Sequence, residues 1–534
     1  MRLNKPWAQS FPFPTAREQQ IVAIDRAIAT FSSGKRFQLL EMGVGCGKSA
    51  VAATLAHWTA SNSVTTSACQ SGAYILTSQK ILQDQYERDF SECVSSVKSA
   101  SAYSCHKFGA SCSEANKLFA VLTQAGVPAE SCGSTCAYKA AKERFLSSEI
   151  GVTNYPFFMN DAVYARDIHK RALMVIDEAH SLEQSLCGLA ELRLTSQSVK
   201  KLLAIELPKL SSIADVVEWL REAVLSAAAD AAEASRAMLK SLVKRDSESR
   251  EALAEAKKLD QLMKLLSRVK RALQLVNDSW VLCDVSAEAD SICLRPTDVS
   301  AVAESCLFKY ASNVLLMSAT MSDHAVIASA LGINVSDYDY ISLPSPFDPA
   351  NRPIHYVPIG KMSMREADAT LPSLIEAVKT ILEAHSADKG IVHTGNYKIA
   401  RALQAAIGSD SRCLFHDDTN RELKLTEHVT SQAPTVLFSP SMTDGVDLHD
   451  DLSRFQIICK LPFPNTADPW VKKRCERDES WLAWITASRI AQAVGRSVRH
   501  EADWAHTYIL DACWKRFLSQ NAKFFSESFT RALT

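Results

Sequence analysis

The chain has 534 residues, of which 47% are hydrophobic and 22% are charged, and its formal net charge is −1. This composition is ordinary for a folded globular protein, so it excludes a disordered or collagen-like chain. No apolar run is long enough for a transmembrane helix, and the first residues lack the apolar stretch of a signal peptide. Because the net charge is close to zero, any binding of nucleic acid has to come from local basic grooves.

The length predicts about three to five domains or subdomains. The 15 cysteines are an odd number in a long chain without a secretory signal. This pattern predicts reduced thiols in a cytoplasmic protein, in which a tight cysteine cluster favours a metal site over a disulfide framework.

Short apolar runs that end in small polar motifs recur along the chain and alternate with helical patterns. Alternation of this kind predicts an α/β fold whose parallel sheets carry helices on both faces. Ligands bind at the carboxyl ends of such strands, so the polar motifs are the candidate functional segments. The runs begin at residues 37, 73, 172, 314, 390, 435, 455 and 507.

The first motif is EMGVGCGKS, residues 41–49, between an apolar run and a helical stretch. Its glycines let the backbone wrap a phosphate and are Gly43, Gly45 and Gly47. Lys48 would reach the β- and γ-phosphates of a nucleotide, and Ser49 would bind Mg²⁺. Met42 stands where the usual phosphate loop has glycine. Taken alone, the segment is also compatible with an ordinary glycine-rich turn.

Four cysteines follow, with six, 19 and three residues between them: Cys105, Cys112, Cys132 and Cys136. Four thiolates can hold an iron–sulfur cluster or a structural zinc ion. Zinc sites usually pair their ligands at short gaps, so the six-residue gap favours a cluster. Spacing alone leaves the cluster, zinc and free buried thiols open, and Cys93 is a possible substitute ligand.

The next motif is Asp177-Glu178-Ala179-His180, directly after the run ALMVI. Adjacent carboxylates at a strand end are costly unless they meet a cation or water. Asp177 is suited to Mg²⁺, and Glu178 to orienting and deprotonating the attacking water. An exposed acidic turn is the alternative for the tetrapeptide alone. Together with the glycine-rich loop, the motif predicts nucleotide hydrolysis.

Residues 190–285 are predicted to form a helical insertion, either a hairpin or a small bundle. No glycine occurs between Gly188 and Gly332, and leucines recur at helical spacing from Leu259 onward. A packed bundle without a function of its own is the alternative.

The last motif is QAVGRSVR, residues 492–499. Arg496 and Arg499 are three residues apart and share one helix face. Two neighbouring guanidinium groups favour an anionic partner, and a γ-phosphate in its transition state is one. A solvated basic helix face is the alternative.

These motifs, in this order, resemble those of the superfamily 2 helicases. The residues Glu-Met before the phosphate loop, the DEAH tetrapeptide and QAVGRSVR are similar, more narrowly, to the XPD/DinG family of iron–sulfur DNA helicases, and the chain resembles a compact DinG-like member. Further segments that resemble family motifs are Thr77–Gln85, Asn154-Tyr155, Ser318–Thr320, Ser345–Phe347, Gly390–Tyr397, Thr443–Asp447 and Lys460–Phe463.

The resemblance implies roles for further residues. Arg17 and Gln20 in TAREQQ correspond to the adenine-side Gln motif, with Gln19 as the alternative register. Gly445 and Asp447 belong to the nucleotide-binding motif V, in which Asp444 replaces the usual glutamate and leaves its role open. Gln492 joins the two arginines as a catalytic residue, and the four cysteines are the expected ligands of a 4Fe–4S cluster.

The resemblance also implies two RecA-like motor domains with ATP in the cleft between them. Its expected segments are motor domain 1 at 1–90, 151–189 and 286–345, an iron–sulfur domain at 91–150, a helical Arch-like domain at 190–285, and motor domain 2 at 346–534.

The implied function is an ATP-dependent DNA helicase that moves 5′ to 3′ on single-stranded DNA and unwinds forked or tailed duplexes. ATP, Mg²⁺ and a 4Fe–4S cluster are the expected cofactors. A cytoplasmic monomer without a membrane partner is expected, in a bacterial, phage or plasmid-encoded context. The alternatives are a translocase that strips proteins with weak unwinding, and an ATP-gated DNA-binding damage sensor, against which Glu178 and the paired arginines argue.

Overall fold

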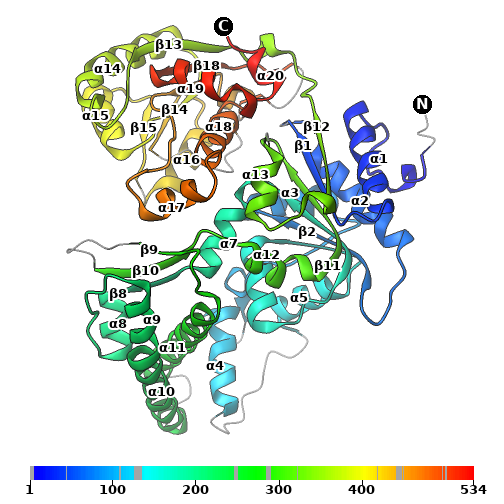
Figure 1. The fold of residues 1–534 in the computed structure, drawn as a ribbon, viewed down its shortest axis with the longest axis vertical. Helices are drawn as coiled ribbons and strands as arrows, with labels where there is room; N and C mark the ends of the chain where they lie inside the picture. Colours follow the sequence, from blue (N-terminus) through cyan, green and yellow to red (C-terminus); the bar gives the residue numbers. More distant parts are fainter. Residues whose placement is uncertain are drawn as a thin grey trace.

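The computed structural model describes residues 5–43, 45–106, 110–124, 135–245, 250–283, 290–321, 323–417, 419–440, 448, 450–495, 497–498 and 502–534. Two parallel sheets with their helices form two lobes, and two insertions project from the first lobe (Figure 1). No helix in these ranges has both the length and the hydropathy to cross a bilayer.

The first lobe contains a seven-stranded sheet in the order β12-β1-β11-β7-β2-β6-β3, and every neighbouring pair is parallel. Its strands are β1 (Phe37–Met42), β2 (Gln70–Thr77), β3 (Ser95–Ser96), β6 (Ile150–Asn154), β7 (Arg171–Asp177), β11 (Ala311–Ser318) and β12 (Tyr338–Leu343). Its helices are α1 (Glu18–Ser32), α2 (Lys48–Asn62), α3 (Lys80–Asp89), α5 (Ala137–Ser147), α6 (Tyr155–Asn160), α7 (Leu182–Ala190), α12 (Ser300–Cys306) and α13 (His324–Ala330).

Both faces of this sheet are covered, which explains why its strands are continuous apolar runs in the sequence. Leu40 and Met42 of β1 pack with α1 and α2 in one core cluster, whereas Phe37 and Leu39 belong to a cluster that includes α6, α7 and α12. Successive side chains of a strand point to opposite faces, so one strand contributes to both cores.

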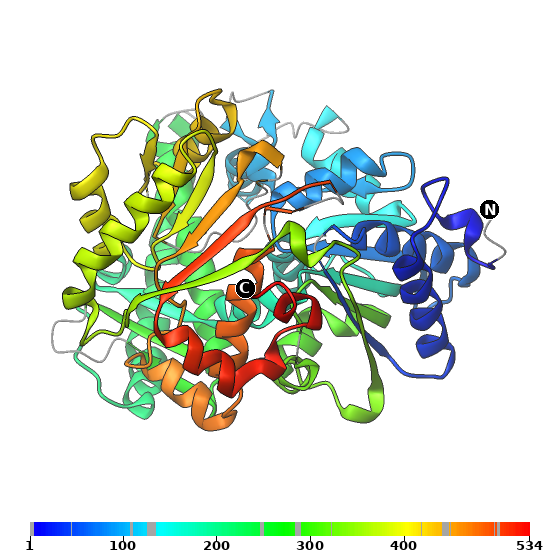
Figure 2. The same cartoon turned by 90° about the horizontal axis from the view of Figure 1, so that it is seen from above.

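The second lobe contains a six-stranded parallel sheet in the order β13-β18-β17-β14-β16-β15. Figure 2 shows its strands between yellow helices on one side and orange and red helices on the other. The strands are β13 (Ile354–Gly360), β14 (Gly390–His393), β15 (Cys413–Phe415), β16 (Val436–Ser439), β17 (Phe455–Ile458) and β18 (His506–Asp511). The helices are α14 (Ala367–Ala384), α15 (Tyr397–Ile407), α16 (Arg421–Thr430), α17 (Pro469–Arg477), α18 (Trp481–Val494), α19 (Cys513–Asn521) and α20 (Glu527–Thr530).

All eight apolar runs singled out in the sequence form strands of these two sheets. The predicted α/β fold class with parallel sheets is therefore confirmed. The strands that the sequence did not predict include β12 and β13, in which tyrosine, aspartate, serine and histidine interrupt the apolar pattern.

The first insertion lies between β3 and α5 and contains β4 (Ser104–Cys105), β5 (Ala110–Ser111) and α4 (Cys112–Gln124). The second contains α8 (Ser196–Leu203), α9 (Ile213–Trp219), α10 (Leu225–Arg245) and α11 (Arg250–Leu275), and its two long helices pack against each other. Helix α4 packs against both of them.

The second insertion was predicted to be helical, but it also contains strands. Its base is a three-stranded antiparallel sheet in the order β8-β10-β9, formed by β8 (Leu192–Thr195), β9 (Trp280–Cys283) and β10 (Ser291–Pro296). Strand β10 lies in the segment assigned from the sequence to motor domain 1. These strands have only four to six residues and gain their stability from pairing, so the sequence carries little local signal for them.

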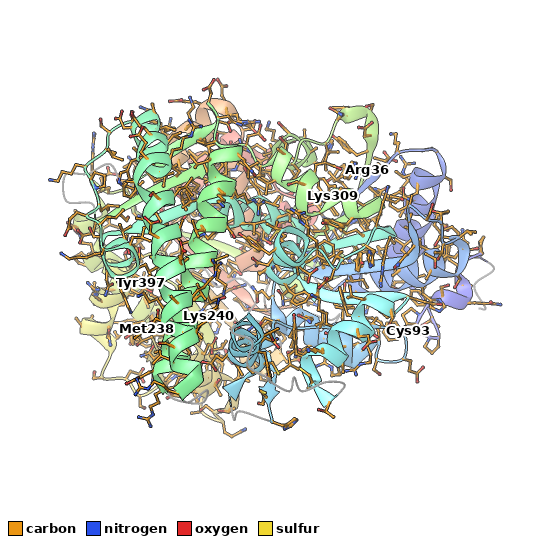
Figure 3. All side chains as sticks on the ribbon, turned by 90° about the horizontal axis from the view of Figure 1, so that it is seen from below. Arg36, Cys93, Met238, Lys240, Lys309 and Tyr397 are labelled. Carbon is orange, nitrogen blue, oxygen red and sulfur yellow. The ribbon has the colours of Figure 1, made fainter. Side chains whose placement is uncertain are left out.

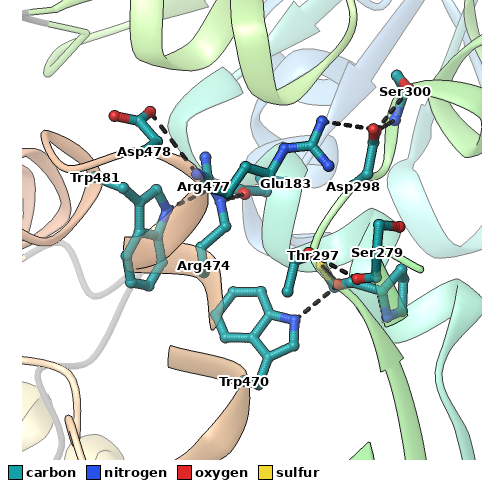
Figure 4. Close-up of polar contacts among 12 residues, drawn as sticks. Glu183, Ser279, Thr297, Asp298, Ser300, Trp470, Arg474, Arg477, Asp478 and Trp481 are labelled. Atoms are coloured by element: carbon teal, nitrogen blue, oxygen red, sulfur yellow. Dashed lines mark hydrogen bonds and ion pairs between the residues drawn. The ribbon is translucent and has the colours of Figure 1, made fainter. Parts of the chain in front are cut away.

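The lobes meet where α17 and α18 pack on the first lobe (Figure 4). The Arg474 Nε lies 2.6 Å from Glu183 Oε1 on α7, and the side chains are 2% and 12% exposed. The Trp481 indole N–H donates to the other Glu183 oxygen at 3.0 Å. Nearby, the Trp470 indole donates to the Pro296 carbonyl at 2.7 Å.

Replacing Arg474 should destabilise this contact strongly. Breaking a buried ion pair leaves an uncompensated charge and costs about 3–5 kcal/mol. We expect Arg474→Ala to lower the free energy of unfolding by that amount in urea titrations. The matched control is Arg477→Ala, because Arg477 forms a 2.5 Å ion pair with Asp298 at the same interface but is 36% exposed. Arg477→Ala should lower the free energy of unfolding by no more than about 1 kcal/mol. Equal decreases for the two variants would contradict the stronger role of the buried ion pair.

His428 makes the stability of the second lobe depend on pH. Its side chain is fully buried, with ring nitrogens 2.9 Å from the Leu452 carbonyl and 2.9 Å from Thr435 Oγ1. Burial is the main cause that lowers its pKa from 6.5 to about 4.

The folded state therefore resists protonation that the unfolded chain accepts. Stability from neutral His428 is complete above pH 6.5 and is lost progressively as the pH falls to about 4. The pKa difference corresponds to about 3 kcal/mol. We expect the unfolding free energies of wild type and His428→Gln, measured between pH 8 and pH 4, to converge on acidification. A constant difference across this range would contradict the assignment.

Candidate nucleotide-binding site

Three polar motifs converge because their strands are neighbours in one parallel sheet. Glu41 of β1 lies opposite Ser318 of β11, and Met317 of β11 lies opposite Asp177 of β7. The carboxyl ends of parallel strands meet at one edge. The glycine-rich loop, the DEAH segment and the Ser318–Thr320 segment therefore lie side by side.

The loop between β1 and α2 has the conformation that its glycines allow. Gly45 and Gly47 have φ angles of +75° and +79°, which favour glycine. A Cβ atom on Gly47 would lie 2.2 Å from Gln20 Nε2, and one on Gly43 would lie 3.1 Å from Ser345 Cβ. The N-terminus of α2 follows at Lys48, and such a terminus is suited to binding phosphate.

The segment before α1 contacts this loop directly. The Arg17 guanidinium donates to the Gly45 carbonyl at 2.7 Å, and the Gln20 amide donates to the Gly47 carbonyl at 3.2 Å. The backbone N–H of Arg17 donates to Gln20 Oε1 at 2.9 Å, which orients that amide. The two residues assigned to the Gln motif are thus brought to the phosphate loop.

The residues expected to hold Mg²⁺ are linked through a buried tyrosine. The Tyr86 hydroxyl on α3 donates to Asp177 Oδ2 at 3.1 Å and is hydrogen-bonded to the Ser49 side chain. Lys48 Nζ donates to the Met42 carbonyl at 3.2 Å across the loop. Ser49 and Asp177 therefore face one small volume at the start of α2.

Burial and, next, the charge of Glu178 raise the pKa of Asp177 to about 6, and the nearby Lys48 ammonium opposes this shift. A buried carboxyl held in this way gains from a cation beside it. Glu178 follows at a φ of +57° and lies 3.3 Å, through Oε2, from His180 Nδ1. The same His180 nitrogen lies 2.9 Å from Ser318 Oγ, so the DEAH segment touches the end of β11.

The second lobe reaches this edge through α18. The Gln492 amide donates to Thr320 Oγ1 at 3.1 Å, and Ser488 Oγ lies 3.1 Å from the same oxygen. Gln492 is thus placed beside the first lobe. Arg496 and Arg499, and Asp444, Gly445 and Asp447 of motif V, lie outside the described residues.

Tyr86, Glu41 and Arg352 contribute to the site although the sequence analysis assigned them no role. The Glu41 carboxylate accepts a hydrogen bond from the Met321 backbone N–H at 3.3 Å. Burial raises the pKa of the Cys46 thiol, and the positive charges of Lys48, Arg17 and Arg352 oppose this shift. Tyr86 lies within α3, which follows Thr77, and in the sequence it is indistinguishable from a buried core residue of a helix. No local signal marked Arg352.

Two family profiles match separate parts of the chain. Residues 14–208 match the family described as "Type III restriction enzyme, res subunit", and residues 381–532 match "Helicase C-terminal domain". The first range contains the glycine-rich loop and DEAH, and the second contains QAVGRSVR.

Two curated relatives are similar over part of their length. The chain is 26% identical over 281 residues to the ATP-dependent DNA helicase DinG of Photobacterium profundum, covering 48% of this chain and 40% of that protein. It is 25% identical over 261 residues to the ATP-dependent DNA helicase YoaA of Escherichia coli, covering 46% and 40%. The chain therefore matches less than half of the length of these relatives.

The fold is similar to that of solved structures along nearly the whole chain. S. tokodaii Xpd4 gives a TM-score of 0.60 at 17% identity and covers 97% of this chain and 99% of its own. A second structure, "XPD_Helicase", gives 0.63 at 15% identity and covers 96% and 98%. The chain is thus similar in fold to these XPD structures and, over part of its length, similar in sequence to the DinG and YoaA helicases. This likeness in fold identifies the two lobes as RecA-like.

Three of the four cysteines converge in the first insertion. Cys105, Cys112 and Cys136 are 3%, 3% and 5% exposed and belong to one cluster, and Cys132 lies outside the described residues. Burial raises the pKa of the Cys112 thiol, and its neighbours Cys136 and Cys105 add to the shift.

The helix termini around these thiols fit an anionic group. Cys112 is the first residue of α4, and Cys136 is the N-cap of α5. The positive ends of both helix dipoles favour thiolates at these positions. Cys93 is exposed, and Figure 3 shows it far to one side of Met238 and Lys240 on α10, the helix against which α4 packs.

Proposed function

We propose that this chain is an ATP-dependent DNA helicase that translocates on single-stranded DNA and unwinds tailed or forked duplexes. The observation that carries the proposal is the contact of Gln492 with Thr320, because it joins the second lobe to the edge where the phosphate loop and DEAH lie. Binding of a nucleotide alone would not require residues from both lobes at one edge. A hydrolytic motor that opens and closes does require them.

Each site residue has a role in this proposal. Arg17 and Gln20 lie on the adenine side of the nucleotide, and Gly445 and Asp447 of motif V would also bind the nucleotide. Lys48 and the loop glycines bind the phosphates, and Ser49 and Asp177 hold Mg²⁺, which neutralises charge on the phosphate oxygens. Glu178 accepts the proton of the attacking water. Arg496, Arg499 and Gln492 reach the γ-phosphate when the lobes close.

The domain arrangement is part of the same proposal. Motor domain 1 comprises 1–90, 151–189 and 286–345, and motor domain 2 comprises 346–534. The iron–sulfur domain at 91–150 and the Arch-like domain at 190–285 enclose the DNA strand and separate the duplex. The expected polarity is 5′ to 3′, by similarity to the family, and we expect a cytoplasmic monomer.

Cys105, Cys112, Cys132 and Cys136 would hold a 4Fe–4S cluster. The buried thiols and the two helix N-termini support this assignment. When bound, the cluster crosslinks a short segment that has little apolar core of its own. The chain's own residues then attach this segment to the motor, since Arg171 donates to the Phe145 and Leu146 carbonyls at the end of α5.

Lys48→Ala should abolish ATP hydrolysis and unwinding. Loss of the ammonium group removes its contact with the transferring phosphoryl group, so we expect a decrease of at least about 100-fold in DNA-stimulated phosphate release. Strand displacement should be measured on 5′-tailed and 3′-tailed duplexes. The control is Lys379→Ala, which changes a lysine on α14 whose side chain is 41% exposed and paired with Glu376.

Equal unwinding by wild type and Lys48→Ala would refute the helicase proposal. DNA-stimulated hydrolysis with little displacement would instead identify a protein-stripping translocase. Single-turnover hydrolysis without stimulation by DNA would identify an ATP-gated sensor.

Protein purified without oxygen should be yellow-brown and contain about four iron atoms per chain. Cys136→Ser should lose iron, because it removes a buried ligand, whereas Cys93→Ser should keep it. Metal analysis and the visible absorption spectrum measure both results. A colourless wild type with one zinc and no iron would overturn the cluster, and loss of iron in Cys93→Ser would overturn the ligand set.

A further inference from the structure

Met321, directly after the Ser318–Thr320 segment, is held by side chains from both lobes. Its backbone N–H donates to Glu41 Oε1 of β1 at 3.3 Å. Its carbonyl accepts a hydrogen bond from the Trp484 indole of α18 at 3.1 Å. Met321 is fully buried and Trp484 is 2% exposed, so water does not compete for either contact. One residue therefore connects the strand before the phosphate loop with a helix of the second lobe.

The Glu41 end of this connection is fixed in place. Its second oxygen accepts a hydrogen bond from the Tyr340 hydroxyl of β12 at 2.5 Å. Glu41 is 5% exposed and belongs to β1, two residues before Gly43. A displacement of the phosphate loop and the end of β1 is thus transmitted to the Met321 backbone.

The α18 end is equally well fixed. Trp484, Ser488 and Gln492 are spaced four residues apart and lie on one face of the helix. All three contact the Thr320-Met321 dipeptide. The helix ends at Val494, two residues before Arg496. A shift of Met321 therefore moves the helix that leads to the arginine pair.

Trp484 also borders the DEAH segment. It lines a small pocket together with Ala179, His180, Glu183, Ile327, Ala330 and Leu331. Its ring fills space between the lobes, whereas its N–H makes the bond to Met321. These two contributions can be separated by substitution.

We propose that Trp484 and Glu41 are positioning residues that couple ATP hydrolysis to movement of the second lobe through the backbone of Met321. The inference rests on the proposed helicase function and deepens it. A buried donor or acceptor that loses its partner carries the cost of its desolvation, so the two bonds persist while the lobes move. Met321 then transmits motion instead of being released in each cycle.

Trp484→Phe tests the role of the indole N–H, because it keeps most of the ring. The matched control is Trp470→Phe, which removes an indole-to-carbonyl bond of the same kind, to Pro296 at 2.7 Å, away from the nucleotide edge. The readouts are KM for ATP, kcat for DNA-stimulated hydrolysis, and base pairs unwound per ATP. We expect Trp484→Phe to unwind about five- to tenfold fewer base pairs per ATP with KM nearly unchanged, and Trp470→Phe to match wild type in this ratio.

A second pair of variants tests the Glu41 end independently. Glu41→Gln keeps an oxygen acceptor for the Met321 N–H, whereas Glu41→Leu removes it. We expect the glutamine variant to retain coupling and the leucine variant to lose it as Trp484→Phe does. The melting temperature shows whether each variant is folded. If Glu41→Leu does not fold, the comparison of Trp484→Phe with Trp470→Phe tests the inference.

The outcomes distinguish this inference from the function on which it rests. A wild type without DNA-stimulated hydrolysis refutes the proposed function and the coupling together. A wild type that unwinds DNA, with equal base pairs per ATP in Trp484→Phe and Trp470→Phe, leaves the helicase function intact and refutes the role of Trp484.

Discussion

The parallel register of β1, β11 and β7 is the constraint on which the rest of the molecule depends. It aligns Glu41 with Ser318 and Met317 with Asp177, so three segments far apart in the sequence end at one edge. Backbone hydrogen bonds set this register, and a slip by one residue would turn every side chain to the opposite face. The loop, the paired carboxylates and the Ser318–Thr320 segment obtain their mutual placement from the sheet.

The second lobe shares an apolar cluster with the first lobe and is also attached to this edge by buried polar contacts. Indole N–H groups of Trp481 and Trp484, an arginine–glutamate pair and a glutamine–threonine hydrogen bond occupy the interface. Such contacts are directional and are costly to leave unpaired, whereas apolar contacts tolerate sliding. The polar part of the interface is therefore suited to defining particular relative positions of the lobes.

The same reasoning applies to the first insertion. Its described cysteines are buried at the starts of two helices, and Arg171 on the central sheet holds the end of the second one. Arg171 is only 1% exposed and lies over the Tyr74 ring at 4.3 Å, a cation–π contact that compensates part of its burial. Local chemistry at the cysteines is thus connected mechanically to the strand that ends in DEAH.

The sequence by itself determined the eight principal strands, the glycine-rich loop and the DEAH carboxylates, because apolar runs and phosphate-binding segments are local patterns. The cysteines were likewise singled out by their spacing, and Gln492 by the family resemblance. The structure places Gln492 beside Thr320 and gathers Cys105, Cys112 and Cys136 in one cluster. Only the tertiary structure revealed Tyr86 between Ser49 and Asp177 and the antiparallel sheet at the base of the second insertion. It also revealed the hydrogen bonds of Glu41 and Trp484 to the Met321 backbone. Each of these depends on partners tens to hundreds of residues apart, and no local periodicity records which buried polar groups will meet when sheets and helices pack.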